Sequence, residues 1–275
     1  MQSPEDQIIL IDKPAGISSF GVVAKVRAHL CNEFGHKIKV GHTGTLDPFA
    51  TGLLILLTGK MTKKSSEFLK LDKVYEATLR LGYVSSTGDP EGQIQQYKAP
   101  KDTLSRSIFA DKQIQQHFSE GAITQYKAPG DTLSRSIFAD GANTERPSPV
   151  TTGARERSEK DVSSVLNGFI GQIEQTPPRF SAIKINGQRA YKLARKGQDF
   201  EIPSRKIEIY SIDILNYNYP ELKIRVHCSS GTYIRTLAED IGKALNIGAY
   251  LTALRRTKIA NYDVKNATSL SQFSA

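Results

Sequence analysis

One acidic side chain in the sequence is placed where it could carry out covalent or proton-transfer chemistry. Asp47 lies in residues 41–54, where glycines, a proline and several hydroxyl residues precede a hydrophobic run. Glycine lets a backbone approach a ligand closely, and Pro48 biases Asp47 toward an extended conformation. A carboxylate fixed on such a loop is a candidate nucleophile or general base. Taken alone, the pattern favours an aspartate that closes an Asx turn.

Other familiar catalytic and cofactor motifs do not fit. In the run 58–61, six residues rather than four separate Gly52 from Gly59, and Met61 stands where a phosphate-binding loop needs a hydroxyl. The five histidines show no metal-ligand spacing. The two cysteines, Cys31 and Cys228, form no CxxC pair, which argues against a disulfide scaffold or a thiolate zinc site. We therefore expect no metal and no organic cofactor.

The loop containing Asp47 reads GHTGTLDPFATGLL, which resembles the catalytic loop of the TruB family of tRNA pseudouridine synthases. Further segments resemble the family's other motifs, in the family's order, over residues 8–270. They are residues 11–19, 73–77, 87–92, 175–184, 187–197, 228–237 and 254–256. So long an ordered series makes the resemblance specific.

The resemblance implies isomerisation of uridine to pseudouridine in RNA. The N-glycosidic bond breaks, the uracil turns, and its C5 rejoins C1′, after the base has left its stack at a cost of a few kcal/mol. Asp47 matches the catalytic aspartate, and Arg235 matches the arginine that pairs with it. Tyr75 matches the active-site tyrosine, whose ring can stack on the uracil. Whether Asp47 attacks C1′ or removes a sugar proton stays open.

Eight further residues are expected to bind the substrate. His42 matches a histidine that contacts the RNA or the displaced base, and Leu254 matches an apolar residue of the pocket. Basic and aromatic residues interleave over residues 184–196, as suits contact with RNA phosphates, and the segment resembles a mobile loop of the family. The expected substrate-binding residues are His42, Leu254, Tyr233, Lys13, Lys184, Arg189, Tyr191 and Arg195.

The elements that position these residues follow from hydrophobic periodicity. Strands are expected where apolar residues alternate, and helices where they recur with helical spacing. The strands lie at 75–83 and 222–228, and the helices begin at Ser18 or Ser19, at Asp161 and after residues 231–232. Because strands and helices interleave without a βαβ rhythm, we expect an α+β fold with a mixed, mostly antiparallel central sheet. The resemblance makes this the pseudouridine synthase catalytic fold, with helices and loops flanking the sheet.

Composition and charge limit the class of protein. The chain has 275 residues, of which 39% are hydrophobic and 24% are charged, as is ordinary for a soluble globular protein. Its longest aliphatic run, residues 53–57, is far shorter than the roughly 20 residues that span a bilayer. The N-terminus is polar, so we expect no secretory signal and a reducing cytosol as the compartment. The net charge of +9 favours a polyanionic partner.

Residues 93–160 differ in sequence pattern from the rest of the chain. Residues 92–111 and 121–140 match at 17 of 20 positions, and residues 141–160 contain almost no large apolar side chains. We expect one catalytic domain over residues 1–275, interrupted at 93–160 by a mobile insertion outside the active site. The chain stops soon after Leu270, where typical bacterial members continue into a small RNA-binding domain, so we expect that domain to be missing.

The resemblance implies a tRNA synthase acting on the uridine at position 55 of the T-loop. Its partner is the tRNA T-stem-loop; we expect a monomer in the cytoplasm, with no membrane and no obligate protein partner. One alternative is a non-catalytic protein that binds or folds tRNA, and another is a synthase for a different RNA. The pair of Asp47 and Arg235 argues against binding as the sole role, because contact with phosphates does not need a buried carboxylate.

Overall fold

The protein is described here by a computed structural model that covers residues 5–98, 157–185 and 187–273. A single ten-stranded sheet dominates it, with the strand order β14-β1-β3-β12-β4-β11-β10-β7; β2 pairs with β3, and β13 with β12. The β1–β14 and β3–β12 pairs are parallel and the other pairs antiparallel. The predicted α+β class with a mixed, mostly antiparallel sheet is therefore confirmed.

The strands of this sheet are β1 (Ile8–Lys13), β2 (Val40–His42), β3 (Thr51–Thr58), β4 (Lys73–Leu81), β7 (Gly171–Gln175), β10 (Arg205–Asn218), β11 (Glu221–Cys228), β12 (Ala249–Ile259), β13 (Tyr262–Asp263) and β14 (Thr268–Ser269). Two small ribbons pair β5 (Tyr83–Ser85) with β6 (Ile94–Gln96), and β8 (Lys184–Ile185) with β9 (Gln188–Arg189). The helices are α1 (Ser19–Phe34), α2 (Ser65–Leu69), α4 (Glu159–Asn167), α5 (Ala190–Arg195) and α6 (Ile234–Ala244), with 3-10 turns η1 (Gly59–Lys64), η3 (Val264–Asn266) and η4 (Leu270–Phe273).

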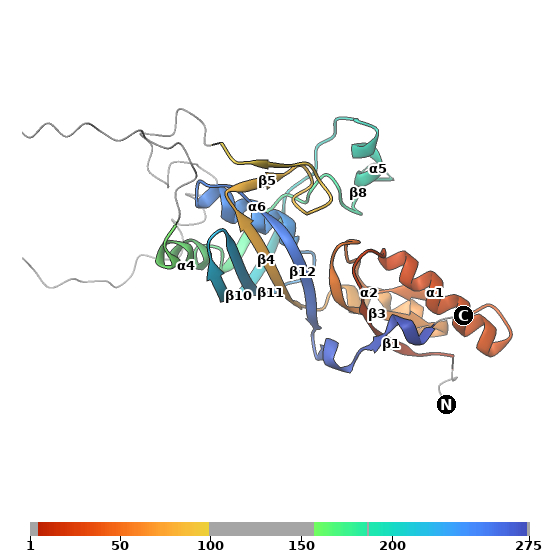
Figure 1. Cartoon of the computed structure of the whole chain (residues 1–275). Helices are drawn as coiled ribbons and strands as arrows, with labels where there is room; N and C mark the ends of the chain where they lie inside the picture. The colour runs from red at the N-terminus through yellow and green to blue at the C-terminus, as the bar shows by residue number, and fades with distance from the viewer. Residues whose placement is uncertain (1–4, 99–156, 186, 274–275) are drawn as a thin grey trace, which may run out of the picture.

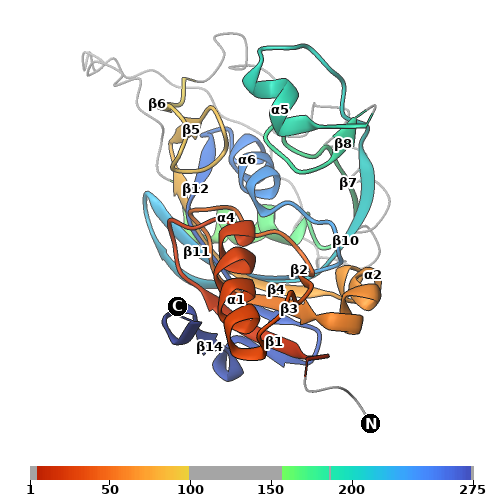
Figure 2. The ribbon, with the colours of Figure 1, turned by 90° about the vertical axis from the view of Figure 1, so that its right-hand side faces the viewer.

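Two hydrophobic layers hold the helices against the sheet. Helices α4 and α6 pack on β4, β10, β11 and β12, where Tyr75, Ala77, Leu79 and Leu81 alternate inward as predicted. Helix α1 packs on β1 and β3 through a separate cluster. Figure 1 shows α4 and α6 at one end of the sheet and α1 with β1 and β3 at the other. In Figure 2 the excursion that carries β8 and α5 lies above both α6 and α1.

The caps of two helices explain where they begin. The Ser18 hydroxyl accepts a hydrogen bond from the Gly21 backbone N–H at 3.0 Å, which confirms the predicted start of α1. Helix α4 begins at Glu159 rather than at Asp161 as predicted. Ser158 is its N-cap, and Asp161 occupies the third position and completes a capping box with Ser158. The prediction began the helix at Asp161 because this residue precedes the first apolar residue, Val162.

Both ends of the segment 93–160 lie in the described part of the chain. Residues 94–96 form β6, and the Tyr97 backbone N–H donates to the Gly82 carbonyl at 2.9 Å. The predicted insertion boundary at 93 therefore falls inside a described ribbon, whereas most of the repeat lies in residues 99–156, outside the described residues. No helix in the described ranges is long and apolar enough to cross a membrane.

Candidate active site

The loop that carries Asp47 joins β2 to β3 and is held by the first residue of α1. The Ser19 hydroxyl donates to the Leu46 carbonyl at 2.9 Å and accepts from the Leu46 N–H at 2.8 Å. The Ala50 N–H donates to the Asp47 carbonyl at 3.1 Å, which closes a turn around Pro48. These bonds fix the backbone on both sides of the Asp47 carboxylate.

Asp47 and Arg235 meet across 188 positions of sequence. The Asp47 Oδ2 atom lies 3.0 Å from Arg235 Nε, and Oδ1 accepts from Arg235 Nη2 at 3.3 Å. The carboxylate is thus held by one hydrogen bond, from Nη2, and by a close ion-pair contact with Nε. The Arg235 side chain is 5% exposed and that of Asp47 is 32% exposed, so the carboxylate remains open to a ligand on one side. Burial raises the pKa of Asp47, while the neighbouring Arg235 charge opposes that rise.

A second carboxylate, Asp89, holds the other side of Arg235. Arg235 Nη1 donates to Asp89 Oδ2 at 3.1 Å, and Nη2 also donates to the Phe180 carbonyl at 2.8 Å. Asp89 is in turn fixed by Thr87, whose hydroxyl donates to its Oδ1 at 2.5 Å. Asp89 was not among the predicted site residues, although the motif at 87–92 contained it. Asp89 positions Arg235 through this hydrogen bond.

The negative charge of Asp89 also acts on Asp47, whose pKa it raises. We expect the Asp89→Asn variant to move the acidic limb of the pH–rate profile to lower pH. Removing this charge lowers the pKa of Asp47, so the carboxylate stays ionised at more acidic pH. Single-turnover rates measured across the acidic range check this. The control is Asp240→Asn, which removes an acid paired with Lys243 on the same helix; a profile that moves equally in both variants would contradict the assignment.

Tyr75 lies on β4 in the same apolar cluster as Leu46, Ala50 and Leu254. Burial raises the pKa of its phenol, partly offset by the charge of Arg256, so the hydroxyl stays protonated. Arg256 is itself fully buried, with Nε donating to the Leu53 carbonyl at 2.8 Å and Nη2 to the Gly44 carbonyl at 3.1 Å. Arg256 was not predicted as a site residue. It ties the catalytic loop to β3 and β12.

Lys13, which is predicted to bind the substrate, is bonded to protein carbonyls in the structure. Its side chain is fully buried, and its ammonium donates to the carbonyls of Pro14, Ile17 and Pro48 at 2.9, 2.7 and 3.1 Å. Burial lowers its pKa to about 8. The ammonium thus donates three hydrogen bonds to backbone carbonyls, and one of these belongs to Pro48, the residue that follows Asp47. Lys13 positions the catalytic loop from within.

Replacing Lys13 by methionine keeps an apolar stem but removes the ammonium. We expect a fall of about 100-fold in single-turnover rate, the scale on which small misplacements of catalytic groups act. The affinity for RNA should change little. The control Lys25→Met removes an exposed ammonium from α1 and should leave the rate unchanged. An RNA affinity that falls while the rate at saturation is kept would instead support a substrate contact for Lys13.

The remaining predicted substrate residues lie around this centre. His42 ends β2; its Nδ1 accepts from the Gly44 N–H at 3.4 Å, and burial together with the charges of Arg256 and Arg189 lowers its pKa. Burial and these charges favour the neutral ring, and the bond to Nδ1 favours the tautomer that carries its proton on Nε2. Tyr233 precedes α6, and the Arg205 guanidinium lies 4.8 Å from the centre of its ring. Leu254 is buried beside Tyr75 in the main core.

The segment 184–196 forms an excursion from the sheet that carries β8, β9 and α5. Lys184 and Arg189 face each other across the ribbon and are exposed. Arg195 is exposed on α5, with its guanidinium 5.7 Å from the centre of the Tyr191 ring. The charge of Arg189 contributes to the lowered pKa of His42, after burial and the charge of Arg256. Within the described ranges, no group of three or more His, Cys, Asp or Glu side chains is arranged to hold a metal.

Comparison with known proteins decides the family. A protein-family model described as "TruB family pseudouridylate synthase (N terminal domain)" matches residues 32–129 and 138–234. The chain belongs to the TruB family. A second model, described as "tRNA pseudouridylate synthase B C-terminal domain", matches residues 235–275. The family assignment predicted from the motifs is therefore confirmed.

Relatives with related sequences agree with this, and a solved structure shares the fold. The chain is 39% identical over 274 residues to the tRNA pseudouridine synthase B of Phocaeicola vulgatus, covering 99% of this chain and 94% of that protein. It is 37% identical to that of Clostridium kluyveri, covering 96% of this chain and 71% of the longer relative. The crystal structure of a Cbf5-Nop10-Gar1 complex matches with a TM-score of 0.60 at 23% identity, over 97% of this chain but 53% of that one. This last likeness concerns the fold alone.

Proposed function

We propose that this protein isomerises uridine to pseudouridine in tRNA, at position 55 of the T-loop, in the cytoplasm. The observation that supports it most is the Asp47–Arg235 ion pair, in which about a third of the Asp47 side chain stays exposed. The loop neighbours of Asp47, Leu46 and Ala50, lie in the apolar cluster that contains Tyr75 and Leu254. Its relatives in Phocaeicola vulgatus and Flavobacterium johnsoniae are named tRNA pseudouridine synthase B.

The chemistry divides among these side chains. Ionised Asp47 acts at the ribose, by attack on C1′ or by removal of a sugar proton, and the N1–C1′ bond breaks. The uracil turns, the C5–C1′ bond forms, and the hydrogen on C5 is lost while N1 gains a proton, so the product is an isomer of the substrate. Arg235 keeps the carboxylate ionised and oriented. Tyr75 offers an aromatic face for the base and a neutral hydroxyl for proton transfer.

Unmodified tRNA transcripts test this proposal. We expect the purified protein to convert the transcript in a single turnover and the modified position to map to residue 55. A transcript with cytidine in place of that uridine should gain no pseudouridine. Tight binding without conversion of any uridine would favour a protein that only binds or folds tRNA. Conversion at another site would favour a different RNA target.

The basic excursion predicts a salt dependence of RNA binding. Exposed Lys184 and Arg195 are expected to contact phosphates, so the double variant Lys184→Gln with Arg195→Gln should flatten the plot of log affinity against log salt. Each lost phosphate contact should reduce the slope by about 0.7 to 0.9. Lys160→Gln with Lys265→Gln removes two exposed charges from α4 and η3 and serves as the control. An unchanged slope in the first double variant would place the RNA elsewhere.

A further inference from the structure

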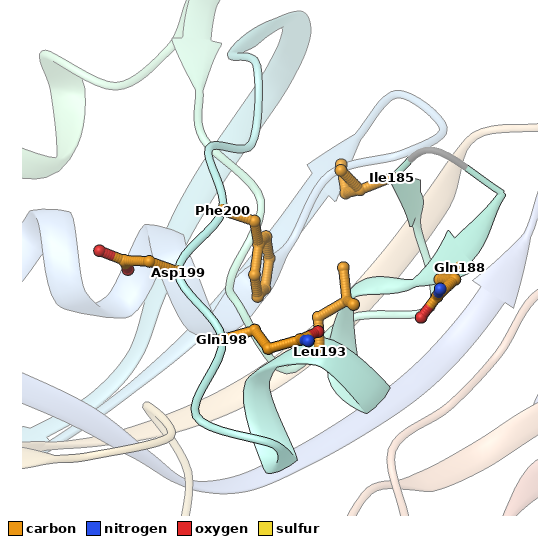
Figure 3. A pocket seen from close by; sticks show the side chains of 6 residues that line it. All are labelled: Ile185, Gln188, Leu193, Gln198, Asp199 and Phe200. Atoms are coloured by element: carbon orange, nitrogen blue, oxygen red, sulfur yellow. The ribbon is translucent and has the colours of Figure 1, made fainter.

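The basic excursion contains a pocket that the proposed chemistry does not use. It has a volume of about 470 Å³ and lies between the β8–β9 ribbon, α5 and the segment 198–200. Figure 3 shows the ring of Phe200 and the side chains of Ile185 and Leu193 turned toward one another across it, with the amides of Gln188 and Gln198 at its rim. Asp199 completes the lining.

The lining combines an aromatic face with primary amides. A primary amide offers two donors and one acceptor, which suits the mixed hydrogen-bonding edge of a nucleobase. An aromatic ring offers a stacking surface to any base. The exposed Asp199 carboxylate is paired with Arg179 at 3.0 Å, and the Arg179 guanidinium also lies 4.8 Å from the centre of the Phe200 ring. The pocket is therefore suited to a flat, neutral, polar-edged ligand.

The surroundings suit the charged part of the same ligand. Exposed basic side chains lie on the elements that wall the pocket: Lys184, Arg189, Lys192, Arg195 and Lys196. Such a set attracts a phosphate backbone. A free base or an apolar peptide would make no use of it, whereas a nucleotide within an RNA strand uses both the pocket and its rim.

The pocket is also joined closely to the catalytic centre. Arg179, which packs on Phe200, precedes Phe180, whose carbonyl accepts from Arg235 Nη2 at 2.8 Å. A second backbone bond, from the Tyr191 N–H to the Ser181 carbonyl at 3.0 Å, ties α5 to the same segment. An RNA loop held at Asp47 would therefore pass close to this pocket.

We propose that the pocket receives a second unpaired base of the RNA loop, other than the target uridine, which stacks on Phe200 and is hydrogen-bonded by Gln188 and Gln198. Sequence-specific recognition of RNA commonly splays out unpaired bases onto aromatic side chains in this way. The inference rests on the proposed function, because it takes the substrate to be an RNA stem-loop. It adds a determinant of substrate selection that is separate from the reacting base.

Binding of stem-loops with a single abasic residue tests this, using the full chain with Asp47→Asn so that no turnover occurs. In this background, an abasic residue at one loop position other than the target should weaken binding by about tenfold, within the range of base stacking on an aromatic ring. Adding Phe200→Ala should weaken binding of the intact stem-loop to a similar extent. It should cause no further loss of affinity for that abasic RNA. Gln198→Leu should repeat this pattern more weakly.

Two outcomes would overturn the inference. In the first, the effects of Phe200→Ala and of each abasic substitution on affinity are additive at every loop position. In the second, Phe200→Ala weakens the binding of all RNAs alike, as expected if Phe200 only supports the fold of the excursion. Lys192→Gln is the control for a phosphate contact and should weaken every RNA equally. Conversion of tRNA by the wild-type chain is measured separately, so that a failure of the proposed function is distinguished from a failure of the pocket.

Discussion

The Asp47→Asn variant is expected to lose single-turnover activity by about three orders of magnitude or more, the scale seen when an essential catalytic group is removed. Asparagine keeps the size of the side chain and can still accept from Arg235, but it has no negative charge with which to act at the ribose. RNA affinity should change little, because Asp47 makes no favourable contact with phosphates. Rates at saturating protein and separate binding measurements check both parts.

The pH dependence of the wild-type rate gives the same assignment an independent test. The reaction needs the ionised carboxylate, and burial raises the pKa of Asp47 above its usual range. The rate should therefore fall as the pH drops through the pKa of Asp47, which lies above that of an ordinary aspartate. Asp213→Asn, which changes an exposed acid on β10, should retain both the rate and the profile. Near-normal turnover by Asp47→Asn would show that another group does the chemistry.

The Arg235→Lys variant is expected to lose about 100-fold in rate and about 3–5 kcal/mol in the free energy of unfolding, since it breaks a buried charge network. Arg235 contacts Asp47, Asp89 and the Phe180 carbonyl through three different nitrogens. A lysine ammonium is a point charge on a flexible stem and cannot occupy these positions together. One carboxylate is then left without its partner in a largely buried site.

Arg225→Lys provides the matched control. Arg225 also pairs with a carboxylate, Glu76, at 3.1 Å, but this pair lies on the exposed side of the sheet. Exposed ion pairs contribute about 0–1 kcal/mol, so the control should keep its stability and its rate. Thermal or denaturant unfolding and single-turnover kinetics separate the two variants. Equal, small effects at both positions would mean that Arg235 is not held in the network described.

The local elements were predictable because they depend on neighbours in sequence. The alternation of Tyr75, Ala77 and Leu79 specifies which face of β4 is buried, and Ser18 specifies where α1 begins. Periodicity carries no information about partners far apart in the chain. The contact between Asp47 and Arg235 was expected from the resemblance to a family rather than from any spacing.

The features that the sequence did not reveal depend on contacts between residues that are far apart in the chain. Lys13 was expected to bind the substrate because it lies in a matched motif, and the sequence did not show that its ammonium donates to three carbonyls of neighbouring turns. Asp89 and Arg256 are buried ions whose role appears only when the chain brings β12 beside β3 and α6 beside the 87–92 turn. The pocket at Phe200 combines residues from four short segments, and the sequence alone does not show that these segments meet.

The most direct test of the central proposal is release of tritium from a tRNA transcript labelled with [5-³H]uridine. Formation of the C5–C1′ bond must free the hydrogen on C5, so release reports the isomerisation itself rather than binding. We predict that the wild-type chain releases one equivalent of label from the T-loop uridine in a single turnover. We predict that Asp47→Asn, bound to the same RNA, releases none on that timescale. Saturated binding by the wild-type chain with no tritium released would contradict the proposal.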